Sequence, residues 1–311
     1  MINKDKKVLI VGGSGFIGSK LIENIYKKKQ IIVLDNKKII NKLRKNTTFI
    51  KGNIFSKRTI KKIKNVEIVF FFIGKKGGPE STDIGKSVEY LNSNTKSLEY
   101  FLNNFENKYL KKIIFLSTEH VYGERKSKIN NVYSSEVFPK NYYGLSKLLA
   151  EKILYNFYKE KKVSVIILRF PRVIAFGQKN ILSMMTRSAI YKKKITINKE
   201  NTKFNFIHEE DLVSAMKNSL NKKVKGFKIL NIFNNSKPQK LIILAKKIKK
   251  NIRISEKIKI HEINNPPNNH NPTEIIVSNL LTKKILNWKP KFSLDKIINK
   301  QIKYYEDKKY N

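Results

Sequence analysis

Two residues of complementary chemistry, Tyr143 and Lys147, stand four positions apart in the run Asn141–Lys147. On a helix this spacing places two side chains on one face, one above the other. A neighbouring ammonium favours the phenolate, so it lowers a tyrosine pKa from about 10 toward the range in which a general base works. Because a lysine-rich helix also produces such a pair by chance, its meaning depends on what else the chain contains.

A glycine-rich turn lies upstream, where the apolar run Val8–Val11 leads directly into a stretch with glycines at positions 12, 13, 15 and 18. Gly12, Gly15 and Gly18 keep the spacing of a dinucleotide-binding turn. The first permits a tight turn, the second lets the backbone approach a pyrophosphate, and the third lets the following helix pack on the strand. Backbone N–H groups and the helix dipole then receive the phosphates. Together with the Tyr–Lys pair, this turn predicts hydride chemistry on a hydroxyl.

An acidic residue, Asp35, ends the next apolar run, Ile31–Leu34. At this distance from the glycine turn, a carboxylate accepts hydrogen bonds from the adenosine ribose and repels a 2′-phosphate. NAD is therefore the expected cofactor, rather than NADP. The positive charges of Lys37 and Lys38 would tolerate a 2′-phosphate, which is the argument for NADP. The structural alternative for Asp35 is that it only caps a turn.

Apolar runs alternate with longer amphipathic stretches through the first half of the chain. Strands are expected at residues 8–11, 31–34, 68–73, 113–116 and 163–168, and helices at 17–28, 88–104 and 143–158. Continuous apolar strands separated by helices indicate a parallel sheet covered on both faces, with right-handed crossovers. The predicted class is α/β, with a Rossmann-like doubly wound parallel sheet and a smaller C-terminal substrate-binding region.

The alternation becomes irregular after Arg169, which suggests how the chain is divided. We expect residues 1–172 to form an NAD-binding domain, joined by a returning strand near residues 227–233. Residues 173–311 are expected to form a mainly substrate-binding region that is interleaved with it. The stretch Asn264–Pro267 is predicted to be a loop, since Asn and Pro favour turns.

The composition excludes several kinds of site. There is no cysteine, so a disulfide, a thiol nucleophile and a cysteine-based metal site are impossible. The four histidines show no ligand spacing, and no metal is expected. The run Val8–Val11 is too short for a signal peptide or a membrane span. We therefore expect a cytoplasmic protein without a membrane span.

The formal net charge of +42 is large for 311 residues. Such a surface attracts nucleic acid, anionic membranes or acidic substrates. The lysines are spread along the whole chain, as a coding bias toward Lys, Asn and Ile would produce, so solvated faces are expected. Nucleic acid is accordingly expected to bind only through non-specific charge, and the same charge favours a diphosphate substrate.

Five motifs in order resemble the extended short-chain dehydrogenase/reductase family, and in particular its NAD-dependent epimerase/dehydratase branch. The resemblance covers nearly the whole chain. The motifs are the cofactor turn Val11–Gly18, the segment Ser117–Gly123, the helix Tyr143–Lys147 with Glu151, the element Phe206–Leu212 and the late signature Leu286–Pro290.

The resemblance implies catalytic roles for three residues. Tyr143 is the acid or base at a sugar hydroxyl, Lys147 holds the nicotinamide ribose and lowers the tyrosine pKa, and Thr118 bonds the same oxygen as Tyr143. The position of Thr118 after an apolar run agrees, because open α/β sheets bind ligands beyond the carboxyl ends of their strands. A hydroxyl that caps a turn is the alternative. The resemblance also implies that Asn94 is the structural asparagine of the family. Asn92 is the alternative if the alignment is shifted by two residues.

The implied NAD contacts lie at the ends of the first four strands. Asn53 stands where relatives carry Asp, and its carbonyl oxygen is able to bond the adenine amino group. Gly74 replaces a small residue of the usual pattern. The full set is Gly12, Gly15, Phe16, Ile17, Gly18, Asp35, Asn53, Ile54, Gly74 and Lys147.

Three candidate substrate contacts depart from the family pattern. Glu119 and His120 occupy positions where 4,6-dehydratases carry Asp-Glu, so dehydratase chemistry is not expected. Arg172 stands where many relatives place Asn against the nucleotide diphosphate. An arginine can grip phosphate with two N–H groups, and an ordinary surface arginine is the alternative. Arg169 is expected to be structural.

The resemblance implies an NAD-dependent nucleotide-sugar epimerase or a close oxidoreductase. It would oxidise a sugar hydroxyl transiently, at C4 for preference, and it would form a homodimer by analogy with the family. One alternative is a sugar-nucleotide ketoreductase or dehydrogenase with net hydride transfer. The other is a non-catalytic member that binds RNA or stabilises a complex. The charge supports this last alternative, whereas an intact Tyr143 and Lys147 argue against it.

Overall fold

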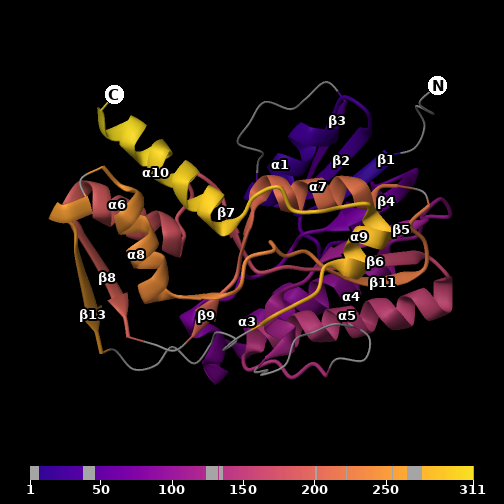
Figure 1. Cartoon of the computed structure of the whole chain (residues 1–311). Coiled ribbons are helices and arrows are strands. Elements are labelled where there is room, and N and C mark those ends of the chain that lie inside the picture. The colour runs from indigo at the N-terminus through magenta and orange to yellow at the C-terminus, as the bar shows by residue number, and fades with distance from the viewer. Residues whose placement is uncertain are drawn as a thin grey trace.

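The computed structural model describes residues 7–37, 46–123, 132, 136–199, 202–221, 223–253, 255–264 and 275–310. Lys38 and most of the predicted loop, Asn265–Pro267, lie outside these ranges. Figure 1 shows a larger part built on one sheet and a smaller part that carries the C-terminal helix. Among the described helices, none combines the length and the apolar character that crossing a bilayer requires.

A seven-stranded parallel sheet runs in the order β11-β6-β5-β4-β1-β2-β3. In chain order its strands are β1 (Lys7–Val11), β2 (Gln30–Asp35), β3 (Thr47–Lys51), β4 (Val66–Phe71), β5 (Lys112–Leu116), β6 (Ser164–Arg169) and β11 (Phe227–Asn231). The order reverses beside β1, the switch point at which open α/β sheets bind ligands. The predicted Rossmann-like doubly wound class is confirmed.

Alternate residues of each strand face two different helical layers. On one face, Val8 and Ile10 pack in a core with α1 (Phe16–Ile25), α7 (Glu209–Ser219) and α9 (Leu280–Leu286). On the other face, Leu9 and Val11 pack in a core with α2 (Lys57–Lys61), α4 (Ser97–Asn104) and α5 (Tyr142–Lys161). Because both faces of the sheet are covered, its inner strands are continuous apolar runs, and such runs could be recognised in the sequence.

The smaller part has its own core, formed by residues between Ile174 and Tyr305. Three helices, α6 (Ile181–Lys192), α8 (Leu241–Asn251) and α10 (Leu294–Tyr310), pack together there, as Figure 1 shows at the side opposite the large sheet. Three strand pairs complete it. They are β7 (Arg172–Ile174) with β10 (Phe206–His208), β9 (Lys203–Phe204) with β12 (Gln239–Lys240), and β8 (Lys194–Asn198) with β13 (Lys259–Ile263).

Two details differ from the sequence-based expectation. Strand β3 was not predicted, because it is an edge strand whose residues are only partly buried, and it lacks a continuous apolar run. The helix expected at 88–104 is divided into α3 (Ser87–Leu91), a π-helical turn at Asn92–Lys96, and α4. Such turns insert one extra residue and often occur at functional sites.

Helix α5 is tied to the sheet by a buried carboxylate, Glu151. Its oxygens accept hydrogen bonds from Arg169 Nε at 3.0 Å and Arg169 Nη2 at 2.5 Å, and also from the Ser117 hydroxyl. Ser117 follows β5, and Arg169 ends β6. The Arg169 guanidinium lies 4.8 Å from the ring centre of Tyr122, whose hydroxyl donates to Asn231 Oδ1 at 2.6 Å. One network therefore joins α5 to the carboxyl ends of three strands, and Arg169 has the structural role that was predicted.

Replacing Glu151 with Gln should lower the free energy of unfolding by about 3–5 kcal/mol, because it leaves the Arg169 charge buried without its counter-charge. Urea titration measures the loss. Glu160→Gln on the same helix is the matched control, since Glu160 pairs with Lys161 on the surface and is 68% exposed. That control should change stability by less than about 1 kcal/mol. Equal losses in the two variants would contradict the structural role of the buried pair.

Candidate active site

The glycine turn after β1 has the shape that a dinucleotide requires. Gly12 adopts φ +80, and a Cβ there would lie 2.8 Å from the backbone nitrogen of Ile73. A Cβ on Gly18 would lie 2.6 Å from the carbonyl oxygen of Gly13, so this glycine lets α1 pack on the turn. A Cβ on Gly15 would meet nothing closer than 3.7 Å. The middle glycine therefore faces the open space that a pyrophosphate would fill.

The amino end of α1 is suited to an anion. Gly15 is its N-cap and offers no side chain, and the first turn carries no acidic residue. Phe16 and Ile17 form that first turn, as expected for residues beside the phosphates. The exposed N–H groups and the helix dipole favour negative charge at this point. These features of the described turn fit a dinucleotide phosphate.

Asp35 lies at the end of β2 beside the glycine turn. Its Oδ2 accepts a hydrogen bond from the backbone N–H of Ser14 at 2.9 Å, and its Oδ1 accepts one from the N–H of Lys37 at 2.9 Å. The turn-capping alternative is thus realised in the structure. The same carboxylate also stands at the rim of the turn, so a contact with a ribose stays a prediction.

The other predicted cofactor contacts lie at neighbouring strand ends. The Asn53 side-chain oxygen accepts from the backbone N–H of Phe55 at 3.0 Å, so the atom expected to bond adenine is already used in a local turn. Ile54 is buried in the core beneath it. Gly74 follows β4, and a Cβ there would lie 2.4 Å from Asn94 Oδ1 and 3.3 Å from Lys147 Nζ. Only glycine leaves room for these two side chains.

Tyr143 and Thr118 meet beyond the carboxyl end of β5. The Thr118 hydroxyl lies close enough to the Tyr143 phenol to act on its pKa, and the ring of Tyr143 lies 5.4 Å from that of His120 and packs against the backbone of Gly77. Asn141 caps α5 by accepting the N–H of Gly144 at 2.7 Å, which fixes the turn that carries Tyr143. The predicted tyrosine and threonine are therefore brought together by local helix capping and by the position of the strand end.

Lys147 lies one turn along α5 and is buried. Its Nζ donates to the carbonyl oxygen of Leu116 at 2.9 Å and lies 4.6 Å from the ring centre of Phe115. Burial lowers the pKa of Lys147 to about 8, and Glu151 opposes that change. The ammonium is therefore held at the end of β5, and the charge that acts on it is Glu151.

The expected lowering of the Tyr143 pKa is not found. Burial raises the pKa of Tyr143, and the hydrogen bond with Thr118 and the charge of Arg172 only partly oppose this, while Glu119 adds to it. Lys147 is not among the groups that act on Tyr143 here, and its Nζ donates to the carbonyl oxygen of Leu116 at 2.9 Å. An effect of Lys147 on Tyr143 stays a prediction.

Asn94 is the buried asparagine of the π-helical turn, and Asn92 is only partly buried. The Nδ2 of Asn94 donates to Ser146 Oγ at 2.9 Å and to the carbonyl oxygen of Lys75 at 3.1 Å. The Thr95 hydroxyl donates to the Ser146 carbonyl oxygen at 2.8 Å. These bonds attach α5 and the loop after β4 to the π-helical turn, which supports the structural role expected of Asn94.

Glu119 was predicted to contact substrate, and it forms a buried polar cluster at the junction of the two parts. Its Oε1 accepts from Arg172 Nη1 at 3.2 Å, and its Oε2 accepts from Asn205 Nδ2 at 3.2 Å. Asn205 also donates to the carbonyl oxygen of Ile275 at 2.8 Å. Burial raises the pKa of Glu119 to about 7, although Arg172 and Asn205 both favour its ionised form. A buried carboxyl in this state can hold or release a proton near neutrality.

Arg172 and His120 complete the predicted substrate set. The Arg172 guanidinium lies 4.7 Å from the ring centre of Phe204 and is paired with Glu119, so one of its N–H groups is already committed. His120 Nδ1 lies 2.9 Å from Asn141 Nδ2, which holds the ring beside Tyr143. Both residues lie at the site. Their partners connect them to its framework, and any contact with substrate stays a prediction.

The structure thus gathers most of the predicted residues at one edge of the sheet. Thr118, Tyr143, Glu119, His120 and Arg172 interact with one another, while Gly74 and Lys147 adjoin. Sequence reasoning missed Asn205 and Tyr90. A signal existed for Asn205, which directly precedes the recognised element Phe206–Leu212. None existed for Tyr90, whose ring lies 6.2 Å from that of Tyr143.

Comparison with known proteins places this geometry in context. Residues 8–232 match the model of the NAD dependent epimerase/dehydratase family. The dTDP-D-glucose 4,6-dehydratase of Dictyostelium discoideum is 30% identical over 69% of this chain and 56% of that protein. An uncharacterized UDP-glucose epimerase of Bacillus subtilis, YtcB, is 27% identical over 61% of this chain and 65% of that protein. The chain thus spans less than two thirds of either relative in these alignments.

A solved structure shares the fold along nearly the whole chain. The UDP-glucuronic acid 4-epimerase of Bacillus cereus, in complex with UDP-glucuronic acid and NAD, has a TM-score of 0.82. The alignment covers 97% of this chain and 99% of that one, at 21% identity. At this level of identity the likeness shows the fold.

The buried carboxyl makes stability depend on pH. The folded-state pKa of Glu119 is about 7, against an ordinary value of 4.5, so the native state holds a proton that the unfolded state releases between these values. Wild-type stability should therefore fall, relative to Glu119→Gln, as pH rises from 4.5 to 7, by up to about 3 kcal/mol. Above pH 7 the difference should stay constant. Urea titrations across this range test the direction, and a difference that rises with pH would contradict it.

Proposed function

The chain belongs to the NAD dependent epimerase/dehydratase family, and from this premise we propose that it is a nucleotide-sugar epimerase. It oxidises a sugar hydroxyl transiently, at C4, and restores it with the opposite configuration. The observation that carries this proposal is the placement of Tyr143 and Thr118 together at the sheet edge that also bears the glycine turn. All three relatives reported above are named for reactions at position 4 of a sugar or for UDP-glucose epimerisation.

The chemistry assigns a proton-transfer role to Tyr143. As the phenolate, its oxygen takes the proton of the sugar hydroxyl during oxidation, and the resulting phenol returns that proton during reduction. Because burial raises the Tyr143 pKa, the phenol is the favoured state, and forming the phenolate is the costly step of the cycle. Thr118 lies beside that oxygen and favours its phenolate form, so it assists the uptake of the proton. Holding these groups in position beside the sugar hydroxyl supplies much of the rate acceleration.

The residues of the glycine turn and Asp35 would hold NAD, and Lys147 and Gly74 would adjoin its nicotinamide end. When bound, NAD accepts and returns the hydride, which is chemistry that no side chain offers. Because the hydride returns to the same carbon, an epimerase has no need to release the cofactor. The buried position of Lys147 against Gly74 leaves little space for water there.

A second candidate is sugar-nucleotide dehydration, and the state of Glu119 favours it. Eliminating water requires an acid to protonate the leaving hydroxyl, and a buried carboxyl with a raised pKa can be that acid. Against it, Glu119 is paired with Arg172, and His120 stands where the family pattern carries a carboxylate. A ketoreductase or dehydrogenase with net hydride transfer remains a further rival, as does a non-catalytic RNA-binding member.

We further propose that residues 173–311, apart from the returning strand β11, bind the nucleotide-sugar. Arg172 and the segment that follows it lie where the two parts meet, beside Glu119. We also propose a homodimer through α3 and α5. Val88 is 62% exposed, and Leu145 and Leu149 are 37% and 39% exposed. Apolar side chains on neighbouring helices suit a second copy of the chain.

The decisive experiment begins with the protein as purified. Native mass spectrometry should detect retained NAD or NADH. The protein is then offered UDP-glucose, UDP-glucuronic acid and dTDP-glucose, and products are identified by chromatography. Conversion to the C4 epimer without net NADH supports the proposal. Loss of water from the sugar selects the dehydratase, released NADH selects the dehydrogenase, and no turnover on any sugar contradicts an enzyme of this class.

Replacing Tyr143 with Phe should reduce turnover by about 10²-fold or more, because the variant lacks the proton-transfer hydroxyl. Retained NAD, measured by mass spectrometry, should be nearly unchanged. Tyr142→Phe is the matched control on the adjacent residue and should keep activity. If Tyr143→Phe also lost the cofactor, the tyrosine would be part of the binding site rather than the proton donor.

Replacing Asp35 with Ala should weaken NAD binding more than NADP binding, because the carboxylate is expected to bond the ribose hydroxyls and to repel a 2′-phosphate. Calorimetry with each cofactor measures the ratio. Asn36→Ala serves as the neighbouring control. Equal loss for both cofactors would restrict Asp35 to its observed bonds with the N–H groups of Ser14 and Lys37.

A further inference from the structure

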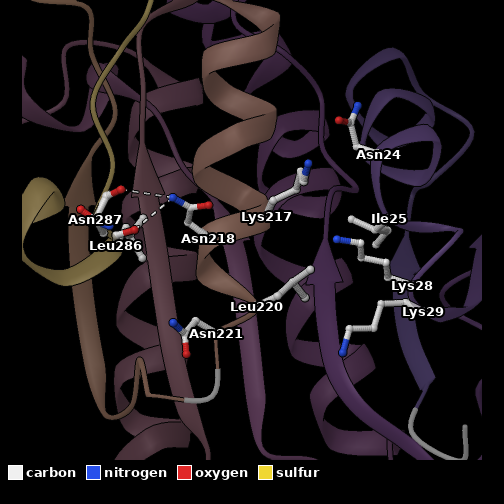
Figure 2. Close-up of a pocket in the computed structure, with 10 residues that line it drawn as sticks. All are labelled: Asn24, Ile25, Lys28, Lys29, Lys217, Asn218, Leu220, Asn221, Leu286 and Asn287. Carbon is white, nitrogen blue, oxygen red and sulfur yellow. Dashed lines mark hydrogen bonds between the residues drawn. The ribbon is translucent and has the colours of Figure 1, made fainter. Parts of the chain in front are cut away.

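Two adjoining hollows lie on the surface away from the active site. The first, of about 450 Å³, is lined by Asn24, Ile25, Lys28, Lys29, Lys217, Asn218, Leu220, Asn221, Leu286 and Asn287, as Figure 2 shows. The second, of about 410 Å³, is lined by Asn221, Lys223, Val224, Lys225, Lys228 and Ile285. Asn221 belongs to both, so the two hollows adjoin each other.

The hollows lie at the amino ends of the strands. Lys29 directly precedes Gln30, the first residue of β2, and Lys225 stands two residues before Phe227, the first residue of β11. The glycine turn and Thr118 instead follow the carboxyl ends of β1 and β5. A ligand in these hollows would therefore bind at the edge of the sheet opposite to the proposed catalytic site.

Positive charge gathers here without a counter-charge. Six lysines line the two hollows, and no carboxylate is among the lining residues. None of the six forms an ion pair with a carboxylate in the part of the chain that the structure describes. Elsewhere several lysines do have such partners, as Lys247 has in Asp295. The cluster therefore carries free positive charge that an anionic ligand would neutralise.

The walls are held in place by hydrogen bonds from three elements. Asn218 Nδ2 on α7 donates to the carbonyl oxygens of Leu286 at 3.0 Å and Asn287 at 3.5 Å, which closes one wall (Figure 2). Lys112 Nζ, at the start of β5, donates to the carbonyl oxygens of Ser219 at 2.8 Å and Asn221 at 2.7 Å. The buried side chain of Lys112 thus fixes the backbone of Asn221, the residue that the two hollows share.

The lining suits an anionic ligand. Lysine and asparagine side chains provide its polar groups, as Figure 2 shows for the first hollow, while Ile25 and Leu286 are buried in the core and expose little apolar surface. A hollow of about 450 Å³ falls in the range of small-ligand sites. The two adjoining hollows contain three lysines each. This arrangement suits a ligand whose phosphates repeat along a backbone.

We propose that this edge of the protein binds single-stranded nucleic acid, with the backbone phosphates on Lys28, Lys29 and Lys217 in the first hollow and on Lys223, Lys225 and Lys228 in the second. The lining contains no aromatic side chain on which a base would stack. Binding is consequently governed by charge, is indifferent to sequence and depends steeply on salt. The binding leaves the proposed catalytic site accessible, because it uses the opposite edge.

The test is the binding of a short fluorescein-labelled oligouridylate, followed by fluorescence anisotropy at several salt concentrations with saturating NAD present. A Lys28→Gln, Lys29→Gln, Lys217→Gln triple variant is compared with a Lys246→Gln, Lys250→Gln, Lys257→Gln triple variant. The second set is exposed, lies on and after α8 and removes the same charge. Thermal melting checks that both variants are folded.

The first variant should lose about tenfold or more in affinity, and its slope of log K against log salt should be shallower by about 2, since roughly 0.7 is lost for each phosphate contact. The control should change affinity by less than about twofold. Equal losses would mean that overall charge binds the oligonucleotide, and they would overturn the proposal. So would the absence of binding at low salt, or displacement by free UMP at the concentration of nucleotide units in the oligomer.

Discussion

One buried carboxylate, Glu151, sets the positions of the groups on which the proposed chemistry depends. It belongs to α5, the helix that carries Tyr143 and Lys147, and it bonds residues at the ends of β5 and β6. The residue after Ser117 is Thr118, so the same bonds fix both hydroxyls of the proposed proton-transfer pair. Removing two charges from water is costly, and it is tolerated here because Arg169 satisfies the carboxylate through two N–H groups.

The two late motifs have a structural explanation of the same kind. Asp211, at the start of α7, accepts the backbone N–H groups of Lys291 at 2.8 Å and Phe292 at 3.1 Å. The indole of Trp288 donates to the Asp211 carbonyl oxygen at 3.1 Å and to Ser214 Oγ at 2.8 Å. The segment that leads into α10 is thereby attached to α7, which packs on the large sheet. These motifs hold the smaller part in place at the edge where Arg172 and Asn205 meet Glu119.

Much of this arrangement could be predicted from the sequence because it is local. The glycine turn, the apolar strands and the capped helix with Tyr143 each depend on residues within one short segment, where spacing and residue type determine geometry. The Glu119 cluster could not be predicted in this way. Its partners Arg172 and Asn205 are 53 and 86 positions away, and their contact depends on how the two parts pack. Strand β3 was missed because an edge strand lacks the apolar pattern that burial imposes.

The raised pKa of Tyr143 shows which groups act at this site. The chain carries a formal charge of +42, yet the pKa of Tyr143 is raised by burial and shifted by Glu119 and Arg172. Surface charges are screened over about 8 Å at physiological salt, whereas buried groups in contact are not. Two of the buried carboxylates, Glu119 and Glu151, each have an arginine partner. The surface charge therefore acts on the approach of anionic ligands, while desolvation and a few fixed pairs control proton transfer.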